Sequence, residues 1–229
     1  MGAVQAQEYA DTRWALALRM RRATAAGIEQ AFDEGTILRT HVLRPTSHLV
    51  APTDIRWMLA LTGPCVSRRM APYNRRLELD ATVFRRNWNA IVRALRGGAQ
   101  LTRQELKAVL QRADVRADGV QRLAHIVMQA ELDAVICSGA RRGNQHTYAL
   151  LDERVPPSRT LSRDEALAEL ARRYFTSHGP AQLQDFMWWS GLAATDARAG
   201  LAMAGRRLKR DDVDGRTYWR SSPVRARRL

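Results

Sequence analysis

The feature that most constrains the fold is a repeated start signal for helices. Residues 101–106 and 161–166 both read as a leucine, a hydroxyl residue and, three positions after the hydroxyl, a glutamate. This pattern is a capping box: the hydroxyl accepts a hydrogen bond from a free backbone N–H at the helix start, and the glutamate accepts one from the hydroxyl residue's own N–H. Both boxes precede amphipathic runs, so each predicts the beginning of a helix within a repeated unit.

Hydrophobic periodicity predicts the rest of each unit. Behind the first box, apolar residues recur at helical spacing over residues 120–128, and two short β-rich runs then flank a basic turn at 139–144. Behind the second box, the pattern predicts helices at 181–190 and 195–204 and a hairpin at 208–219, which turns at Asp214 and Gly215. A third, shorter copy at the front predicts helices at 7–18 and 25–34 and strands at 37–42 and 47–50.

Three helices followed by a basic hairpin is the order of a winged helix-turn-helix, in which the last helix enters the DNA major groove. We therefore predict a mainly α chain with short β-hairpins (α+β), built from tandem winged helix-turn-helix units. The predicted segments are a truncated first winged helix at 1–52, connecting helices at 53–98, winged helices at 99–155 and 156–219, and a basic, disordered tail at 220–229. Within the connecting segment the helices are expected at 53–61 and 80–95.

Charge favours a polyanionic partner. The 229 residues carry a net charge of +14, and from residue 206 onward nine basic residues face three acidic ones. The planar arginine fork binds phosphate through two hydrogen bonds at once. An Ala/Arg-rich bias from genome composition is the alternative explanation for this charge.

Composition also excludes several classes of protein. The hydrophobic fraction of 45% argues against a wholly disordered chain. No apolar run reaches the roughly 18 residues that cross a bilayer, and no secretory signal is visible, so we expect a cytoplasmic protein without a membrane partner. Cys65 and Cys137 are too few for a disulfide framework or a cysteine-based zinc site, and we expect two small buried hydrophobes.

Five segments carry a resemblance to a known family. They are VQAQ at 4–7, LRTHVLRPT at 38–46, HLVA at 48–51, RLAH at 122–125 and YFTSHGPA at 174–181. In this order and spacing, the chain resembles the bacterial winged-helix DNA-binding family that contains the AlkZ-like DNA glycosylases, from Gly2 to about Trp219. Members that are glycosylases excise alkylated purines, including those in interstrand crosslinks.

The resemblance implies that Gln5 and Gln7 are the catalytic pair, because they match the family's Gln-x-Gln signature. An N7-alkylated purine already carries positive charge and leaves without strong protonation. An amide carbonyl can accept a hydrogen bond from the attacking water while its NH₂ group binds the nucleotide. From the residues alone, Gln5 and Gln7 also fit solvated or capping positions near a helix start.

The hairpins supply the predicted DNA contacts. On the first hairpin these are Arg39, His41, Arg44 and His48, because matching family members place this wing close to the DNA site. On the second hairpin they are Arg141, Arg142 and His146. In each hairpin the alternative is that these side chains simply face water. The expected partner is double-stranded DNA, possibly alkylated or crosslinked, bound by a monomer.

Other chemistry finds little support. His41 and His48 have no carboxylate or cysteine nearby in sequence, so no metal site is predicted, and no cofactor motif such as a Gly-rich phosphate loop is present. Phe186, Trp188 and Trp189 could stack on a base, but their helical setting favours core packing. Two alternatives remain at this point: a non-catalytic winged-helix DNA-binding or regulatory protein, and a shortened, partly folded gene product.

Overall fold

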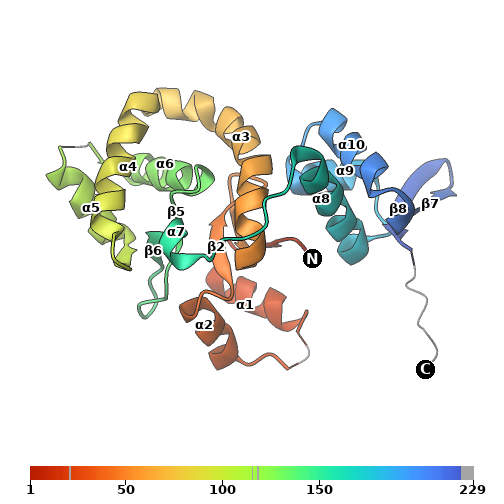
Figure 1. The fold of residues 1–229 in the computed structure, drawn as a ribbon, viewed down its shortest axis with the longest axis horizontal. Helices are drawn as coiled ribbons and strands as arrows, with labels where there is room; N and C mark the ends of the chain where they lie inside the picture. The colour runs from red at the N-terminus through yellow and green to blue at the C-terminus, as the bar shows by residue number, and fades with distance from the viewer. Residues whose placement is uncertain (21, 115, 118, 223–229) are drawn as a thin grey trace. The chain divides into compact units, whose positions relative to one another are not determined.

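The computed structural model describes residues 1–20, 22–114, 116–117 and 119–222. These residues are mostly helical, with short antiparallel strands, as the sequence predicted (Figure 1). The helices are α1 (Tyr9–Ala17), α2 (Ala25–Asp33), α3 (Pro52–Arg76), α4 (Ala81–Leu95), α5 (Arg103–Arg112), α6 (Val120–Leu132), α7 (Leu151–Arg154), α8 (Arg163–His178), α9 (Leu183–Ser190) and α10 (Ala194–Ala204). The strands are β1 (Val4–Gln5), β2 (Leu38–His41), β3 (Ser47–Val50), β4 (Leu101–Thr102), β5 (Ile136–Ser138), β6 (Thr147–Leu150), β7 (Leu208–Val213) and β8 (Arg216–Ser221).

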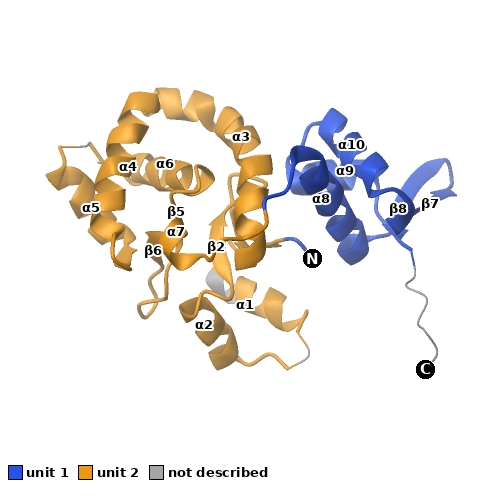
Figure 2. Ribbon diagram, viewed as in Figure 1, with its two compact units in different colours: residues 1–2, 160–229 blue, residues 3–159 orange. Residues whose placement is uncertain are grey.

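The chain divides into two compact units (Figure 2). The larger unit holds residues 3–159, and the smaller one holds residues 1–2 with the chain from residue 160 onward. The boundary lies close to residue 156, where the last winged helix was predicted to begin. The finer division into five segments remains a prediction.

Both units contain the same succession of elements. In the larger unit a strand, two helices and a hairpin occur twice, and the strand orders β1-β3-β2 and β4-β6-β5 correspond. In the smaller unit Ala181 takes the place of the first strand by bridging to Trp219, and α9, α10 and the β7–β8 hairpin follow. The hairpin turns at Asp214 and Gly215, both with positive φ (49° and 72°), as a two-residue turn requires.

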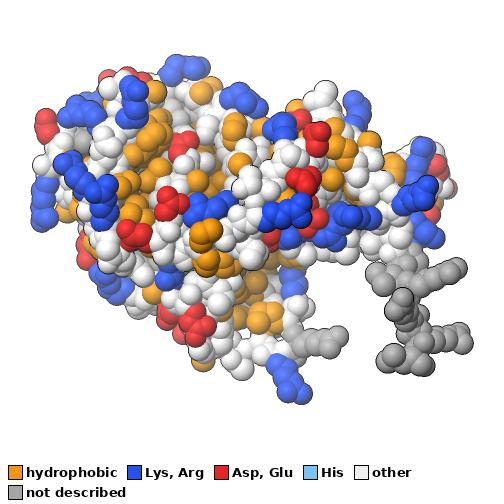
Figure 3. Space-filling view, in the orientation of Figure 1, with side chains coloured by type: hydrophobic (Ala, Val, Ile, Leu, Met, Phe, Trp, Pro, Cys, Tyr) orange, Lys and Arg blue, Asp and Glu red, His pale blue; other side chains and the backbone are white. Residues whose placement is uncertain are grey.

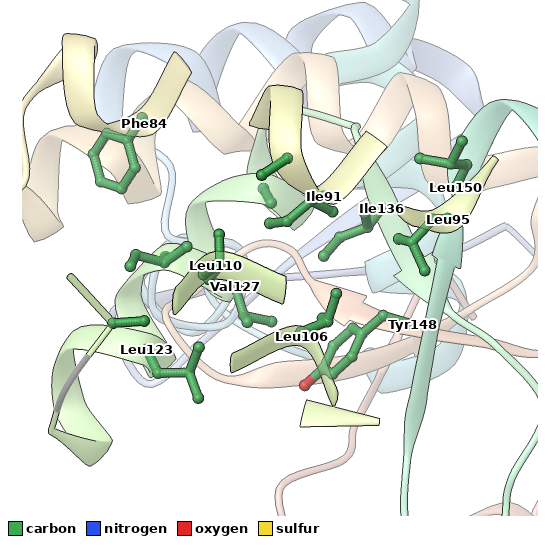
Figure 4. Close-up of a cluster of buried hydrophobic side chains, with 14 of the residues drawn as sticks. Phe84, Ile91, Leu95, Leu106, Leu110, Leu123, Val127, Ile136, Tyr148 and Leu150 are labelled. Atoms are coloured by element: carbon green, nitrogen blue, oxygen red, sulfur yellow. The ribbon is translucent and has the colours of Figure 1, made fainter. Parts of the chain in front are cut away.

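The core of the larger unit confirms the helical periodicities. Apolar side chains of α4, α5 and α6 meet those of β5 and β6 in one buried cluster (Figure 4). Its most buried members include Ile91, Leu95, Leu106, Leu110 and Ile126, all with 0% exposed surface. Packing therefore groups α4 with α5 and α6, although the sequence placed it among the connecting helices.

Both capping boxes form. The Glu105 N–H donates to Thr102 Oγ1 (3.3 Å) and the Thr102 N–H donates to Glu105 Oε2 (2.7 Å); Ser162 and Glu165 repeat this arrangement. The two boxes are not equivalent, however. Thr102 is the last residue of strand β4 and precedes α5, which corresponds to α9 of the smaller unit, whereas Ser162 precedes α8, the helix before the bridging residue Ala181. The pattern marks a helix start and carries no information on which helix of the unit begins there.

Helix α3 is much longer than predicted. The expected helix at 53–61 continues to Arg76 through Pro64 and Pro72, two residues that remove helical hydrogen bonds and usually end a helix. Tertiary packing overrides this local preference, because α3 lies against α6. Their backbones approach so closely that a Cβ added at Gly63 would lie 2.9 Å from the Leu132 carbonyl oxygen.

Three smaller expectations can be compared with the structure. Cys137 is buried and Cys65 is half-buried, and neither forms a disulfide. Among the described residues, no helix combines the length and apolar character needed to span a bilayer. The predicted tail begins inside β8, and its residues 223–229 lie outside the described part of the chain.

Candidate active site

A cavity of about 550 Å³ lies in the larger unit, between its two sheets and the helices α3, α5 and α6. Most of its chemistry comes from six side chains: Gln7, Arg39, His41, Arg103, His125 and His146. Among the lining residues that the structure describes, none is Asp or Glu. The cavity therefore offers imidazoles, guanidinium groups and amides, but no carboxylate of its own.

The structure separates the two glutamines of the predicted catalytic pair. Gln7 lines the cavity, whereas Gln5 lies on strand β1 and its Oε1 accepts a hydrogen bond from the Arg44 guanidinium (3.0 Å). Ala6 between them is buried, its N–H donates to the Ser47 carbonyl (2.8 Å), and its own carbonyl accepts from Arg39 Nε (3.2 Å). These backbone bonds fix the chain just before Gln7.

His41 reaches the cavity from the end of β2 and is held from behind. Its Nδ1 contacts a carboxylate oxygen of Glu131 on α6, whose side chain is only 1% exposed. A carboxylate at Nδ1 favours the tautomer in which that nitrogen carries the proton. In this tautomer Nε2 carries the lone pair and can accept a hydrogen bond or a proton.

His48 does not belong to a DNA-binding surface. His48 is only 1% exposed. Its Nδ1 lies 2.8 Å from the Thr46 carbonyl oxygen, so Nδ1 can carry a proton and donate it to that oxygen. Burial lowers the pKa of His48 to about 4. Strand alternation alone did not show which hairpin histidine faces inward, so we remove His48 from the set of DNA contacts.

Two further histidines line the cavity, and burial lowers the pKa of both, which favours their neutral form. Burial, aided by the nearby positive charges of Arg39 and Arg141, lowers the pKa of His146 to about 4. Burial and, secondarily, His41 lower the pKa of His125, whose Nδ1 lies 2.7 Å from Asn74 Oδ1. Neutral imidazoles can hydrogen-bond a bound group without repelling a cationic one.

The predicted hairpin arginines fall into different environments. Arg39 lines the cavity, and Arg44 binds Gln5 while burial, followed by Arg69, lowers its pKa. Arg142 forms an ion pair with Glu105 (2.8 Å) and donates to the Gln100 carbonyl (2.8 Å). Its guanidinium thus ties the second hairpin to α5, a use that competes with phosphate binding.

The Arg141 N–H donates to Asp33 Oδ1 (2.9 Å), and its guanidinium donates to the Gly143 carbonyl (3.1 Å). On the face shown in Figure 3, basic side chains are spread among acidic ones rather than gathered in a single patch.

Sequence reasoning missed several residues of the site. Arg103 and Gln104 lie at the start of α5, between the capping residues Thr102 and Glu105, and Tyr148 lies on β6. His125 was inside the resemblance at 122–125 but was not singled out. Glu131 gave none, because a carboxylate near the end of a helix ordinarily faces solvent.

The described residues contain no group of three His, Cys, Asp or Glu side chains suited to a metal ion. In the smaller unit, Phe186 is fully buried, in agreement with core packing. The ring centroid of Trp189 lies 5.1 Å from that of Tyr174, which also agrees with core packing. Trp188, in contrast, is 69% exposed.

Comparisons with known proteins agree with one another. The family model "DNA glycosylase AlkZ-like" matches residues 1–228. An interstrand DNA cross-link repair glycosylase of Streptomyces sahachiroi is 25% identical over 226 residues, which cover 93% of this chain and 60% of the relative.

The solved structure of Streptomyces sahachiroi DNA glycosylase AlkZ has the same fold, with a TM-score of 0.76 at 21% identity, over 96% of this chain and 62% of that one. The chain thus spans about 60% of the length of the relatives it matches. On the family match, which extends over nearly all its residues, the chain belongs to the AlkZ-like DNA glycosylase family.

Proposed function

We propose that this chain binds double-stranded DNA and hydrolyses the N-glycosidic bond of an N7-alkylated purine in the cavity of the larger unit. The observation that carries the proposal is the position of Gln7, which lines this cavity together with two arginines and three histidines. A volume of about 550 Å³ falls in the range of sites that enclose a small ligand. A nucleotide extruded from the duplex is a ligand of that size.

The side chains suit a cationic leaving group. An N7-alkylated purine needs no strong acid to leave, and the absence of carboxylates among the described lining residues is compatible with that chemistry. The Gln7 carbonyl would accept a hydrogen bond from the attacking water, while its NH₂ group donates to the nucleotide. Arg39 and Arg103 would bind the flanking phosphates, and Gln5 would act as a positioning residue through Arg44.

The three strand–helix–helix–hairpin segments are best explained as tandem winged helices. What supports this is their common strand order in the larger unit and the matching succession of elements in the smaller one. The printed name of the relative speaks of interstrand cross-link repair. We therefore include crosslinked duplexes among the proposed substrates, bound by one copy of the chain.

Base release tests the proposal. A duplex carrying one N7-methylguanine is incubated with excess 229-residue chain, and the free base is measured by mass spectrometry. We expect release by the parent, a loss of about 100-fold or more in Gln7→Ala and a smaller loss in Gln5→Ala. The exposed Gln121→Ala on α6 is the matched control and should act like the parent.

Two outcomes contradict the assignment. Equal rates for Gln7→Ala and Gln121→Ala would remove Gln7 from the reaction. Tight duplex binding by a parent that releases no base would favour the alternative of a non-catalytic winged-helix DNA-binding protein.

A further inference from the structure

The proposed hydrolysis needs a proton acceptor that a glutamine cannot provide. When the water oxygen bonds to C1′, the C1′–N9 bond breaks and its electron pair neutralises the departing cationic purine. The oxygen keeps one hydrogen as the new hydroxyl group and must lose the other as a proton. An amide oxygen can orient this water, but it is too weak a base to take the proton. Because the described lining residues include no carboxylate, the candidates are His41, His125 and His146.

These three histidines differ in the group that lies next to each ring. His41 contacts the carboxylate of Glu131, whose side chain is 1% exposed. His125 has the neutral amide oxygen of Asn74 2.7 Å from its Nδ1. His146 is influenced by the positive charges of Arg39 and Arg141, and these oppose its protonation. Only the first arrangement stabilises the positive charge that a ring acquires when it takes a proton.

The sheet brings His41 close to Gln7. His41 on β2 pairs with Ser47 on β3, and the carbonyl of Ser47 accepts the N–H of Ala6, the residue before Gln7. Neighbouring strands lie about 4.8 Å apart, so the backbones at residues 6 and 41 are separated by about 10 Å. A glutamine side chain, an imidazole and one water fill such a gap, and both side chains line the same cavity.

We propose that His41 is the general base of this reaction and that Glu131 is its positioning residue. Nδ1 of His41 keeps its proton on the Glu131 carboxylate, and Nε2 accepts the proton of the water that Gln7 orients. The carboxylate stabilises the resulting imidazolium until the proton passes to solvent. Other hydrolases also use a histidine as general base that a carboxylate orients; here the water that it activates attacks a glycosidic carbon. This assignment rests on the proposed function.

The test removes the imidazole ring of His41 by substitution and then adds free imidazole to the solution. In His41→Ala, release of N7-methylguanine should slow by about 100-fold or more, and added imidazole should restore part of the rate. The rescue should grow with pH as the neutral form of imidazole increases. His125→Ala, which empties a neighbouring part of the same cavity, is the matched control and should show no rescue.

Two substitutions separate a chemical role from a structural one. His41→Gln keeps a polar side chain but offers no base, so a chemical role predicts a loss of rate as large as in His41→Ala, whereas a merely structural role predicts release close to that of the parent. Glu131→Gln keeps size and burial, and should slow release by about 10- to 100-fold while affinity for undamaged duplex changes less than about twofold. The titratable or charged groups around this ring include Glu131 and His125 on α6, His48 on β3, Arg39 on β2, Arg103 on α5, and His146 and Tyr148 on the second hairpin.

The outcomes distinguish this assignment from the proposed function. If the parent releases base, Gln7→Ala does not, and His41→Ala acts like the parent or gains nothing from imidazole, the role of His41 is wrong and the proposed function stands. If the parent releases no base, both are wrong. Measuring the affinity of every variant for undamaged duplex shows which variants are folded.

Discussion

The buried His48 in the first sheet should make the free energy of unfolding depend on pH. Its pKa of about 4 in the folded chain lies below the ordinary value of 6.5 because burial disfavours the charged ring. As pH falls below 6.5 the unfolded chain therefore takes up a proton first, and the stability present above that pH is lost progressively down to about pH 4. Between pH 7 and 5 this one group should lower the free energy of unfolding by about 2 kcal/mol.

Urea titrations at pH 7 and pH 5 measure this loss. His48→Gln removes the titrating ring and should reduce the difference between the two pH values. An unchanged difference would show that the folded chain accepts a proton at His48. His146, with a pKa of about 4, is expected to leave a residual pH dependence in the variant.

Arg141 and Arg142 are neighbours in sequence but should contribute differently to DNA binding. The Arg142 guanidinium is paired with Glu105, so a phosphate would have to compete with this ion pair. We expect Arg141→Ala to flatten the slope of log affinity against log salt by about one unit, and Arg142→Ala by much less. Fluorescence anisotropy with a plain duplex between 50 and 200 mM salt measures both slopes. Equal changes would show that the ion pair opens on binding.

Site residues could be predicted from sequence where they belong to a recognisable motif. Gln7, Arg39 and His41 were named before the structure and share one cavity. Glu131 could not be named in this way, because its role depends on a contact with His41, which lies 90 residues away in sequence. His48 was misjudged for a similar reason: the residues that bury it are distant in the chain.

At the scale of elements, local signals located the helix starts, and packing determined helix lengths. The capping residues Thr102 and Ser162 and the hairpin turn at Asp214 and Gly215 form as expected, because each depends on residues close in sequence. Helix α3 was predicted too short, and it contains two prolines, which normally end a helix. Contact with α6 keeps it helical, and no local pattern reports that contact.

The prolines of α3 give a test of this explanation. Pro64 is exposed in the helix interior, so Pro64→Ala restores an N–H for the Ala60 carbonyl and should raise the free energy of unfolding by about 1–2 kcal/mol, after allowing for a more flexible unfolded chain. Pro52 stands at the start of the helix, where proline is favoured, and Pro52→Ala is the matched control, expected to lower stability slightly. Urea denaturation compares the two. A loss of stability in Pro64→Ala would mean that the proline is required for the course of α3.

At the scale of the whole molecule, the fold class could be predicted because the same succession of elements recurs along the chain. The family could also be named, because its motifs are distributed over both units. The division at residue 159 follows from packing within each unit and coincides with a proline-rich segment. The net charge of +14 agrees with a DNA partner, although the ion pairs of Arg142, Arg163 and Arg172 show that part of the basic charge serves internal contacts.

The most direct test of the proposed site is a structure of the chain bound to a duplex that carries a 2′-fluoro analogue of N7-methyldeoxyguanosine, whose glycosidic bond is slow to break. We predict that the modified nucleotide lies in the cavity of the larger unit, with its sugar in contact with Gln7 and His41. A duplex bound with the modified nucleotide elsewhere, and this cavity filled only by solvent, would contradict the account.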